Sequence, residues 1–190
     1  MTMFMKTTGW TALLVVLGAI QAFAQAAAPA PDPMAMLLSG NERYISGKVS
    51  EKKYLSDRAA VVDGQHPYAI ILTCADSRVP PEAIFDETLG KLFVVRVAGN
   101  VVDPVVLGSI EYAVEHLNAK LLVVMGHASC GAVKAAVGHG EFPPNISKIL
   151  QRIQPAVDKV RISEKDENKL LDAVIRENAN ELKVLERDIS

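Results

Sequence analysis

The sequence has no long block of charge of one sign. Its 20 basic and 22 acidic residues leave a net charge of −2. A nucleic-acid footprint and a polybasic membrane patch both need clustered lysine and arginine, so neither is expected. Nor is the chain poor in apolar residues, which make up 49% of it. That share excludes a disordered chain and suits one globular domain of this length.

The N-terminal apolar run is too short to span a membrane comfortably. This uncharged run, over residues 11–24, follows Lys6 and ends in Ala-Phe-Ala, the small-x-small pattern of a signal-peptidase site. We therefore expect a secretory signal peptide over 1–24 and a linker over 25–33, with an uncleaved anchor as the alternative. No cysteine follows the run, so a lipoprotein is not indicated. Export is expected, with the bacterial periplasm as the destination and no stable membrane span after cleavage.

Cysteine is the scarcest reactive residue, with two in the chain. In an oxidising compartment two cysteines are ordinarily interpreted as a disulfide, which here would join Cys74 and Cys130. Two buried, inert thiols are a second interpretation. A metal site that includes both thiolates is a third.

Apolar periodicity predicts an α/β fold, with a mainly parallel β-sheet flanked by helices, over residues 34–190. Continuous apolar runs bounded by turns predict strands that are buried on both faces. These runs cover residues 68–74, 91–100 and 120–127. Helices are predicted over 33–48, 80–90, 103–119, 129–138, 146–160 with an interruption at Pro155, and 167–189.

Two short motifs come directly after predicted strands. Cys74, Asp76 and Arg78 form C-x-D-x-R, and His127 and Cys130 form H-x-x-C. Ligands of a parallel sheet bind beyond the carboxyl ends of its strands, so a shared site is expected there. Two thiolates and one imidazole suit zinc and leave a fourth position for water or a carboxylate. Cys130 is also expected near a helix N-terminus, where the dipole favours thiolate.

These motifs and their surroundings resemble the β-class carbonic anhydrases. The resemblance is carried by "GQHPYAIILTCADSRVPPEAIFD", "LFVVRVAGNVV", "LGSIEYAVEHL" and "LLVVMGHASCGAVKAAV". It implies one Zn2+ per subunit, held by Cys74, His127 and Cys130. The implied activity is reversible hydration of carbon dioxide to bicarbonate and a proton, by attack of zinc-bound hydroxide.

The resemblance also implies an Asp76–Arg78 dyad. In an open form Arg78 holds Asp76 off the metal, and Asp76 accepts a hydrogen bond from the zinc-bound water. In a closed form Asp76 becomes the fourth ligand. The alternative is an ion pair with a structural role alone.

The implied substrate pocket comes from several segments. Gln65 matches the residue that holds a substrate oxygen, and Phe93, Ala98 and Tyr112 match the pocket lining. Gly131 falls where a backbone N–H faces the site. The family is built on dimers that share such pocket residues, so a homodimer or a higher even oligomer is expected.

Two features depart from the family pattern. The single tryptophan, Trp10, lies in the expected signal peptide, so a regulatory bicarbonate pocket that needs tryptophan is not supported. The chain is also expected to lack the last sheet strand or strands. The missing strand motivates one rival hypothesis, a non-catalytic protein that binds zinc or bicarbonate. A separate rival keeps the same scaffold but acts on a carbon dioxide analogue such as CS2 or COS.

Overall fold

The computed structural model describes residues 31–138 and 140–181. The expected signal peptide (1–24) and most of the expected linker (25–33) lie outside the described residues. The described part begins just before helix α1 (Pro33–Ile45), whose first turn is capped by Asp32. The Asp32 carboxylate accepts hydrogen bonds from the backbone N–H groups of Met34 and Ala35, and such caps favour a helix start.

A three-stranded parallel sheet in the order β2-β1-β3 forms the centre of the described domain. The central strand β1 (Ala69–Thr73) is buried along its whole length, which explains its continuous apolar sequence. Its neighbours are β2 (Leu92–Arg96) and β3 (Leu122–Met125). Thr73 pairs with the last residue of each, so all three carboxyl ends meet at one edge. The predicted fold class is confirmed.

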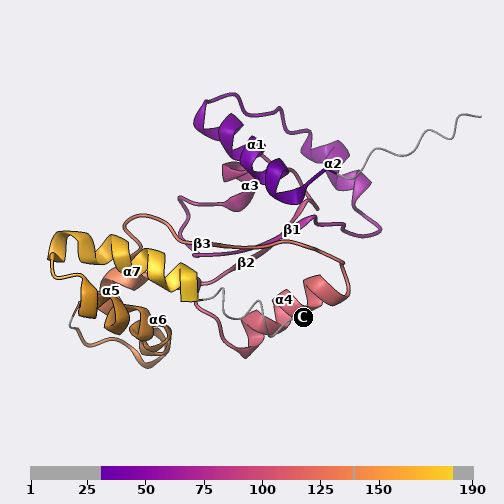
Figure 1. Cartoon of the computed structure of the whole chain (residues 1–190). Coiled ribbons are helices and arrows are strands. Elements are labelled where there is room, and N and C mark those ends of the chain that lie inside the picture. The colour runs from indigo at the N-terminus through magenta and orange to yellow at the C-terminus, as the bar shows by residue number, and fades with distance from the viewer. Residues whose placement is uncertain (1–30, 139, 182–190) are drawn as a thin grey trace, which may run out of the picture. The chain divides into compact units, whose positions relative to one another are not determined.

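Helices cover both faces of this sheet (Figure 1). On one face, Leu37 of α1 and Phe85 pack against Ala69 and Ile71. On the other face lies α4 (Pro104–Glu115), which packs Ile110 and Ala113 on the strands. Two short helices, α2 (Tyr54–Ala60) and α3 (Pro81–Ile84), belong to the α1 side, and the short turn η1 (Ala98–Asn100) follows β2.

A third core lies beyond the carboxyl edge of the sheet, among the last three helices. They are α5 (Gly131–Val137), α6 (Pro144–Ser163) and α7 (Glu167–Glu181). Val133, Ile153, Val157 and Val174 belong to this core, and so do both cysteines. The edge of the sheet where ligands are expected is therefore closed on one side by α5 to α7.

Three helices differ from the sequence-based predictions. Helix α2 falls in a polar stretch where none was predicted, and α3 is shorter than predicted. Helix α3 stops because Asp86 adopts φ +51°, a left-handed conformation in which it meets Arg43 and Lys52. Helix α6 continues through Pro155, where an interruption was predicted.

Helix α6 is not interrupted at Pro155 because of how the residues around this proline pack. Pro155 is exposed, while Ile153, Ala156 and Val157 around it are fully buried against the neighbouring helices. A proline inside a helix costs about 3 kcal/mol. Burial of a valine or isoleucine side chain contributes about 1.5–3 kcal/mol each, which outweighs that cost.

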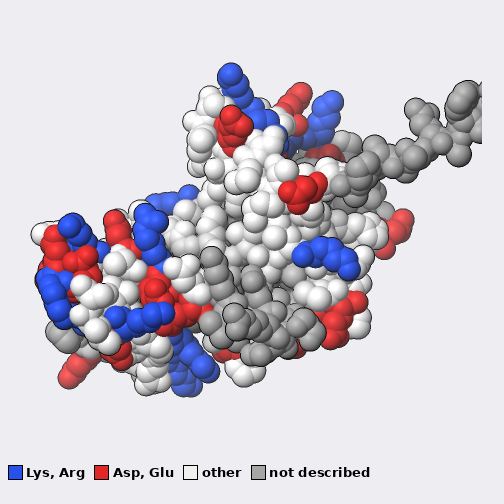
Figure 2. Space-filling model, viewed as in Figure 1, with Lys and Arg blue, Asp and Glu red and all other residues white. Residues whose placement is uncertain are grey.

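The surface of the described domain carries charges of both signs. Figure 2 shows acidic and basic side chains interspersed over α6 and α7 on the face it presents. None of the helices in residues 31–138 and 140–181 combines the length and the apolar character needed to cross a bilayer.

Candidate metal centre

Cys74, His127 and Cys130 converge at the carboxyl edge of the sheet. Their candidate ligand atoms all lie within 4.8 Å of one another. The strand register brings these side chains together, because Cys74 directly follows β1 and only Gly126 separates His127 from the end of β3. Cys130 is the N-cap of α5 and is brought back to the same point by the turn after His127. The predicted shared site is therefore present as a cluster of three side chains, which we call the metal-ligand cluster.

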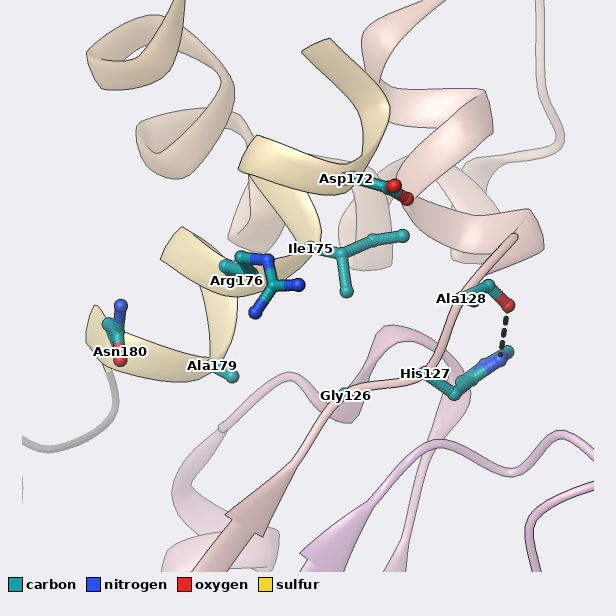
Figure 3. A pocket seen from close by; sticks show the side chains of 8 residues that line it. All are labelled: Gly126, His127, Ala128, Asp172, Ile175, Arg176, Ala179 and Asn180. Carbon is teal, nitrogen blue, oxygen red and sulfur yellow. Dashed lines mark hydrogen bonds between the residues drawn. The ribbon is translucent and has the colours of Figure 1, made fainter. Parts of the chain in front are cut away.

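The imidazole of His127 is oriented for ligation by one nitrogen. Its Nδ1 lies 3.0 Å from the carbonyl oxygen of Ala128, the contact drawn in Figure 3. A carbonyl only accepts, so Nδ1 carries the proton and Nε2 is left with a free lone pair. Nε2 is buried and has no hydrogen-bond partner in the described part of the chain. A buried acceptor without a partner is costly, and a metal ion would satisfy it.

The distance between the two sulfur atoms distinguishes a disulfide from a shared metal site. Both cysteines are free, with their Sγ atoms 4.0 Å apart. A disulfide needs about 2 Å, so the structure does not contain the bridge that the compartment argument favoured. Two thiolates on one tetrahedral zinc, each bonded at about 2.3 Å, stand roughly 3.8 Å apart. The observed spacing therefore fits a shared zinc ion.

Opposing effects act on the pKa of the Cys130 thiol. Burial raises the pKa of the Cys130 thiol, and the neighbouring Cys74 adds to this rise. Backbone N–H groups of Val133 and Ala132, at the start of α5, act in the opposite direction but do not prevail. The N–H groups at the helix N-terminus therefore favour the Cys130 thiolate, as expected, but burial and the neighbouring thiol outweigh them. Two adjacent buried thiols need a cation before both ionise readily.

Asp76 and Arg78 form the bidentate pair that the sequence predicted. Arg78 Nε donates to Asp76 Oδ1 at 2.9 Å, and Arg78 Nη2 donates to Oδ2 at 2.8 Å. The backbone N–H of Arg78 adds a third bond, to Oδ1 at 3.0 Å. These hydrogen bonds hold the pKa of Asp76 well below its usual range, so the carboxylate is ionised at neutral pH. Asp76 Oδ2 lies 3.8 Å from His127 Nε2, beside the metal-ligand cluster.

Arg96 is a residue of the site that the sequence analysis missed. Its Nε donates to the carbonyl of Cys74 at 3.0 Å, and its Nη2 donates to the carbonyl of Asp76 at 2.5 Å. One guanidinium thus fixes the backbone on both sides of Ala75. The available signal was a lone charge at the end of an otherwise apolar run, in "LFVVRV", where a buried charge needs a partner.

The predicted substrate-binding residues fall into two groups. Both Ala98 and Gly131 lie at the metal-ligand cluster: Ala98 precedes Gly99, whose N–H donates to Cys74 Sγ, and Gly131 begins α5 directly after Cys130. Gln65 is exposed in the loop that enters β1 at its amino end, roughly 17 Å of strand away from Cys74. Phe93 and Tyr112 form an aromatic pair, with ring centroids 6.4 Å apart, on the α4 side of the sheet. The described chain alone does not bring these three to the cluster.

Sequence comparison identifies the family. The family model for carbonic anhydrase matches residues 69–187. The chain belongs to the carbonic anhydrase family. Carbonic anhydrase 2 of Mycobacterium tuberculosis is 49% identical over 126 residues, which cover 64% of this chain and 61% of the relative. A carbonic anhydrase of Mycolicibacterium smegmatis is 45% identical over the same length. The chain thus spans about 61% of the length of these curated relatives.

Solved structures of the β-class have the same fold. One of two tetrameric β-carbonic anhydrases from Sordaria macrospora matches with a TM-score of 0.61 and 27% identity, over 80% of each chain. A Coccomyxa β-carbonic anhydrase in complex with acetazolamide also gives 0.61 and 27% identity, over 78% of this chain and 68% of that one. The predicted β-class membership is therefore confirmed.

Proposed function

We propose that this protein is a zinc-dependent carbonic anhydrase, which interconverts carbon dioxide and water with bicarbonate and a proton. The observation that carries the proposal is the buried cluster of two free thiols and an imidazole whose Nε2 has no partner in the described residues. Asp76, held by Arg78, stands next to it. The family membership of the chain supports the same reaction.

Cys74, His127 and Cys130 would hold the zinc ion. Bound by three protein ligands, zinc supplies a fourth position for water and lowers the pKa of that water towards neutrality. The thiols contribute soft anionic ligands, and the Ala128 carbonyl keeps the His127 proton on Nδ1, away from the metal.

Asp76 orients the reacting water. A carboxylate offers about four lone-pair sites, and three are taken by the donors of Arg78. Oδ1 accepts two of these bonds and Oδ2 accepts one, so the remaining site belongs to Oδ2. Oδ2 is also the oxygen that lies 3.8 Å from His127 Nε2. Ionised Asp76 would therefore accept a hydrogen bond at Oδ2 from a water held by the metal, and this bond would orient the water towards carbon dioxide.

Arg78 and Arg96 prevent Asp76 from turning towards the metal-ligand cluster. Arg78 holds both carboxylate oxygens, and Arg96 holds the carbonyl of Asp76. This arrangement supports the open form of the site. A planar guanidinium suits such paired contacts, because its N–H groups form a rigid fork.

Gln65, Phe93 and Tyr112 would serve the pocket of a second copy of the chain in a homodimer or a higher even oligomer. They lie away from the cluster of their own chain, and the similar β-carbonic anhydrases from Sordaria macrospora are tetrameric, which supports an assembly of several copies. Large apolar groups are exposed on α4, where Val105 is 77% and Tyr112 is 49% exposed. Burial of such groups between copies is a common source of dimer stability.

Metal analysis and stopped-flow kinetics on the same preparation test the proposed function. We expect one zinc per chain and carbon dioxide hydration that rises from neutral to alkaline pH. Protein with a Cys74–Cys130 disulfide and no metal would refute the zinc site. Bound zinc without hydration at any pH would instead favour a protein that binds zinc or bicarbonate. Faster turnover of CS2 or COS than of carbon dioxide would favour an enzyme for these analogues.

We also propose export to the bacterial periplasm. The support is the N-terminal pattern of Lys6, an uncharged apolar run and Ala-Phe-Ala. Fractionation of the expressing cell, with N-terminal sequencing of the recovered protein, should give a chain that begins near residue 25. Recovery of the intact chain from the cytoplasm would refute this proposal.

A further inference from the structure

Helix α7 carries one polar residue in its buried stripe. Leu170, Val174 and Asn178 are spaced four residues apart and are all buried, so they share one face of the helix. Asn178 is 5% exposed, and its Nδ2 donates to the carbonyl of Gly99 at 2.9 Å. A buried amide in an apolar stripe is unfavourable unless it is hydrogen-bonded. The contact with Gly99, 79 residues away, therefore explains why this position is not apolar.

Gly99 connects this contact to the metal-ligand cluster. Its backbone N–H donates to Cys74 Sγ at 3.3 Å. Gly99 has φ +71°, which is favourable for glycine and strained for other residues. A Cβ at this position would also lie 2.7 Å from Ile153 Cδ1 and 3.1 Å from Ala132 Cβ. Gly99 thus donates its N–H to Cys74 Sγ and accepts, at its carbonyl, a hydrogen bond from Asn178.

The same helix packs against the segment that carries His127. A Cβ on Gly126 would lie 3.1 Å from Ile175 Cγ2 and 3.4 Å from the carbonyl oxygen of Ile175. Figure 3 shows Ile175 and Ala179 of α7 facing the strand end that leads through Gly126 to His127. Helix α7 therefore touches the backbone beside two different candidate ligands.

We propose that Asn178 is a positioning residue of the metal centre that acts through Gly99 on Cys74. The amide of Asn178 holds the Gly99 carbonyl, and this keeps the Gly99 N–H directed at the sulfur. An N–H donor to a ligand sulfur stabilises its negative charge and fixes its orientation, as outer partners of metal ligands commonly do. The inference rests on the proposed zinc site and extends it to a residue 48 positions beyond the last ligand in the sequence.

The test compares Asn178→Leu with a matched control, Val174→Ala, one turn earlier on the same buried stripe. Zinc affinity is measured by competition with a chelator, and the thiolate-to-metal charge-transfer band is recorded for each Co(II)-loaded protein. Loss of an outer partner typically weakens metal binding about 10–100-fold, so Asn178→Leu should fall in this range and shift the cobalt band. Val174→Ala should lower the unfolding temperature and leave both metal readouts unchanged.

The outcomes separate this inference from the proposed function. Equal zinc affinity and an equal cobalt band in the wild type and Asn178→Leu would overturn the inference alone. Equal metal changes in Val174→Ala would also overturn it, since the effect would then be general loosening of α7. A wild-type protein that takes up neither metal would overturn the zinc site as well. If Asn178→Leu does not fold, Asn178→Ala removes the donor without added bulk and is judged by the same criteria.

Discussion

Two buried polar clusters in this domain differ in how completely they are paired. In the Asp86 cluster, a carboxylate with no exposed side-chain surface meets Arg43 Nε at 2.5 Å and Lys52 Nζ at 2.6 Å. Ser50 donates to it from both its backbone N–H and its hydroxyl. In the metal-ligand cluster, His127 Nε2 has no hydrogen-bond partner among the described residues and the two Sγ atoms face each other at 4.0 Å.

The difference separates a cluster that is complete in itself from one that could hold a metal ion. Burial raises the pKa of Asp86, but hydrogen bonds from Lys52, Arg43 and Ser50 outweigh it and hold the pKa well below its usual range. The Asp86 cluster thus satisfies its own charge and joins α1 to the segment after α3. The metal-ligand cluster leaves His127 Nε2 without a hydrogen-bond partner among the described residues, which fits a site for a cation. Substitutions in each cluster should therefore have separable effects, on metal binding and turnover in one and on stability in the other.

Removal of a ligand should have the largest effect. Loss of a residue that only hydrogen-bonds to a metal ligand typically lowers metal affinity about 10–100-fold. His127→Ala removes a ligand itself, so it should weaken zinc binding more, by about 1,000-fold. Chelator competition measures this directly. His116→Ala, an exposed histidine on the α4 side, is the control and should keep wild-type affinity. Equal zinc affinity in both variants would place the metal elsewhere.

Asp76→Asn should keep the zinc and lose turnover. The amide is not ionised and turns an N–H group towards one of its neighbours, so the water loses its acceptor. We expect carbon dioxide hydration to fall about 100-fold, in the range of a lost acid–base group, with the metal content unchanged. Glu82→Gln removes an exposed carboxylate nearby and should leave the rate unaltered. Wild-type turnover in Asp76→Asn would assign the Asp76–Arg78 pair a structural role alone.

Asp86→Asn should lower stability and spare the metal site. Asparagine tolerates the left-handed backbone at this position, so the substitution tests the charge rather than the conformation. Arg43 and Lys52 are partly exposed and regain some hydration, so we expect a loss of about 2 kcal/mol in the free energy of unfolding. Denaturant titration measures it, and Asp63→Asn in an exposed loop should change stability by less than about 0.5 kcal/mol. Weakened zinc binding in Asp86→Asn would show that the two clusters are coupled.

The pH dependence of the same variant gives the smallest effect. The pKa of Asp86 is lower in the folded than in the unfolded protein, so its contribution is fully present above the unfolded value of about 4. That contribution decreases as the pH falls below this value towards the folded pKa. The stability gap between wild type and Asp86→Asn should therefore be constant from pH 7 to about 5 and narrow from about pH 4 to 3. A constant gap over the whole range would mean that the charge of Asp86 does not stabilise the fold.

Much of the site was predictable because its signals are local. Cys74, Asp76 and Arg78 lie within five residues of sequence, and His127 and Cys130 within four. The strands before them are marked by continuous apolar runs, and parallel strands bring the loops at their carboxyl ends to one edge of the sheet. Helix α2 was missed because it lies in a polar stretch and buries none of its residues. The shortness of α3 was missed because a left-handed Asp86 and its distant partners leave no periodic pattern.

The sequence by itself determined which residues could bind zinc and at which edge of the sheet they would meet. Only the tertiary structure decided what holds them there. Arg96 reaches the backbone of Cys74 and Asp76 from the next strand, and Asn178 reaches Gly99 from the last described helix. Helix α6 likewise continues through the exposed Pro155 because the neighbouring helices bury Ile153, Ala156 and Val157 around it. Ligand types and strand order depend on short-range patterns, whereas these contacts form between residues far apart in sequence and exist only once the helices have packed.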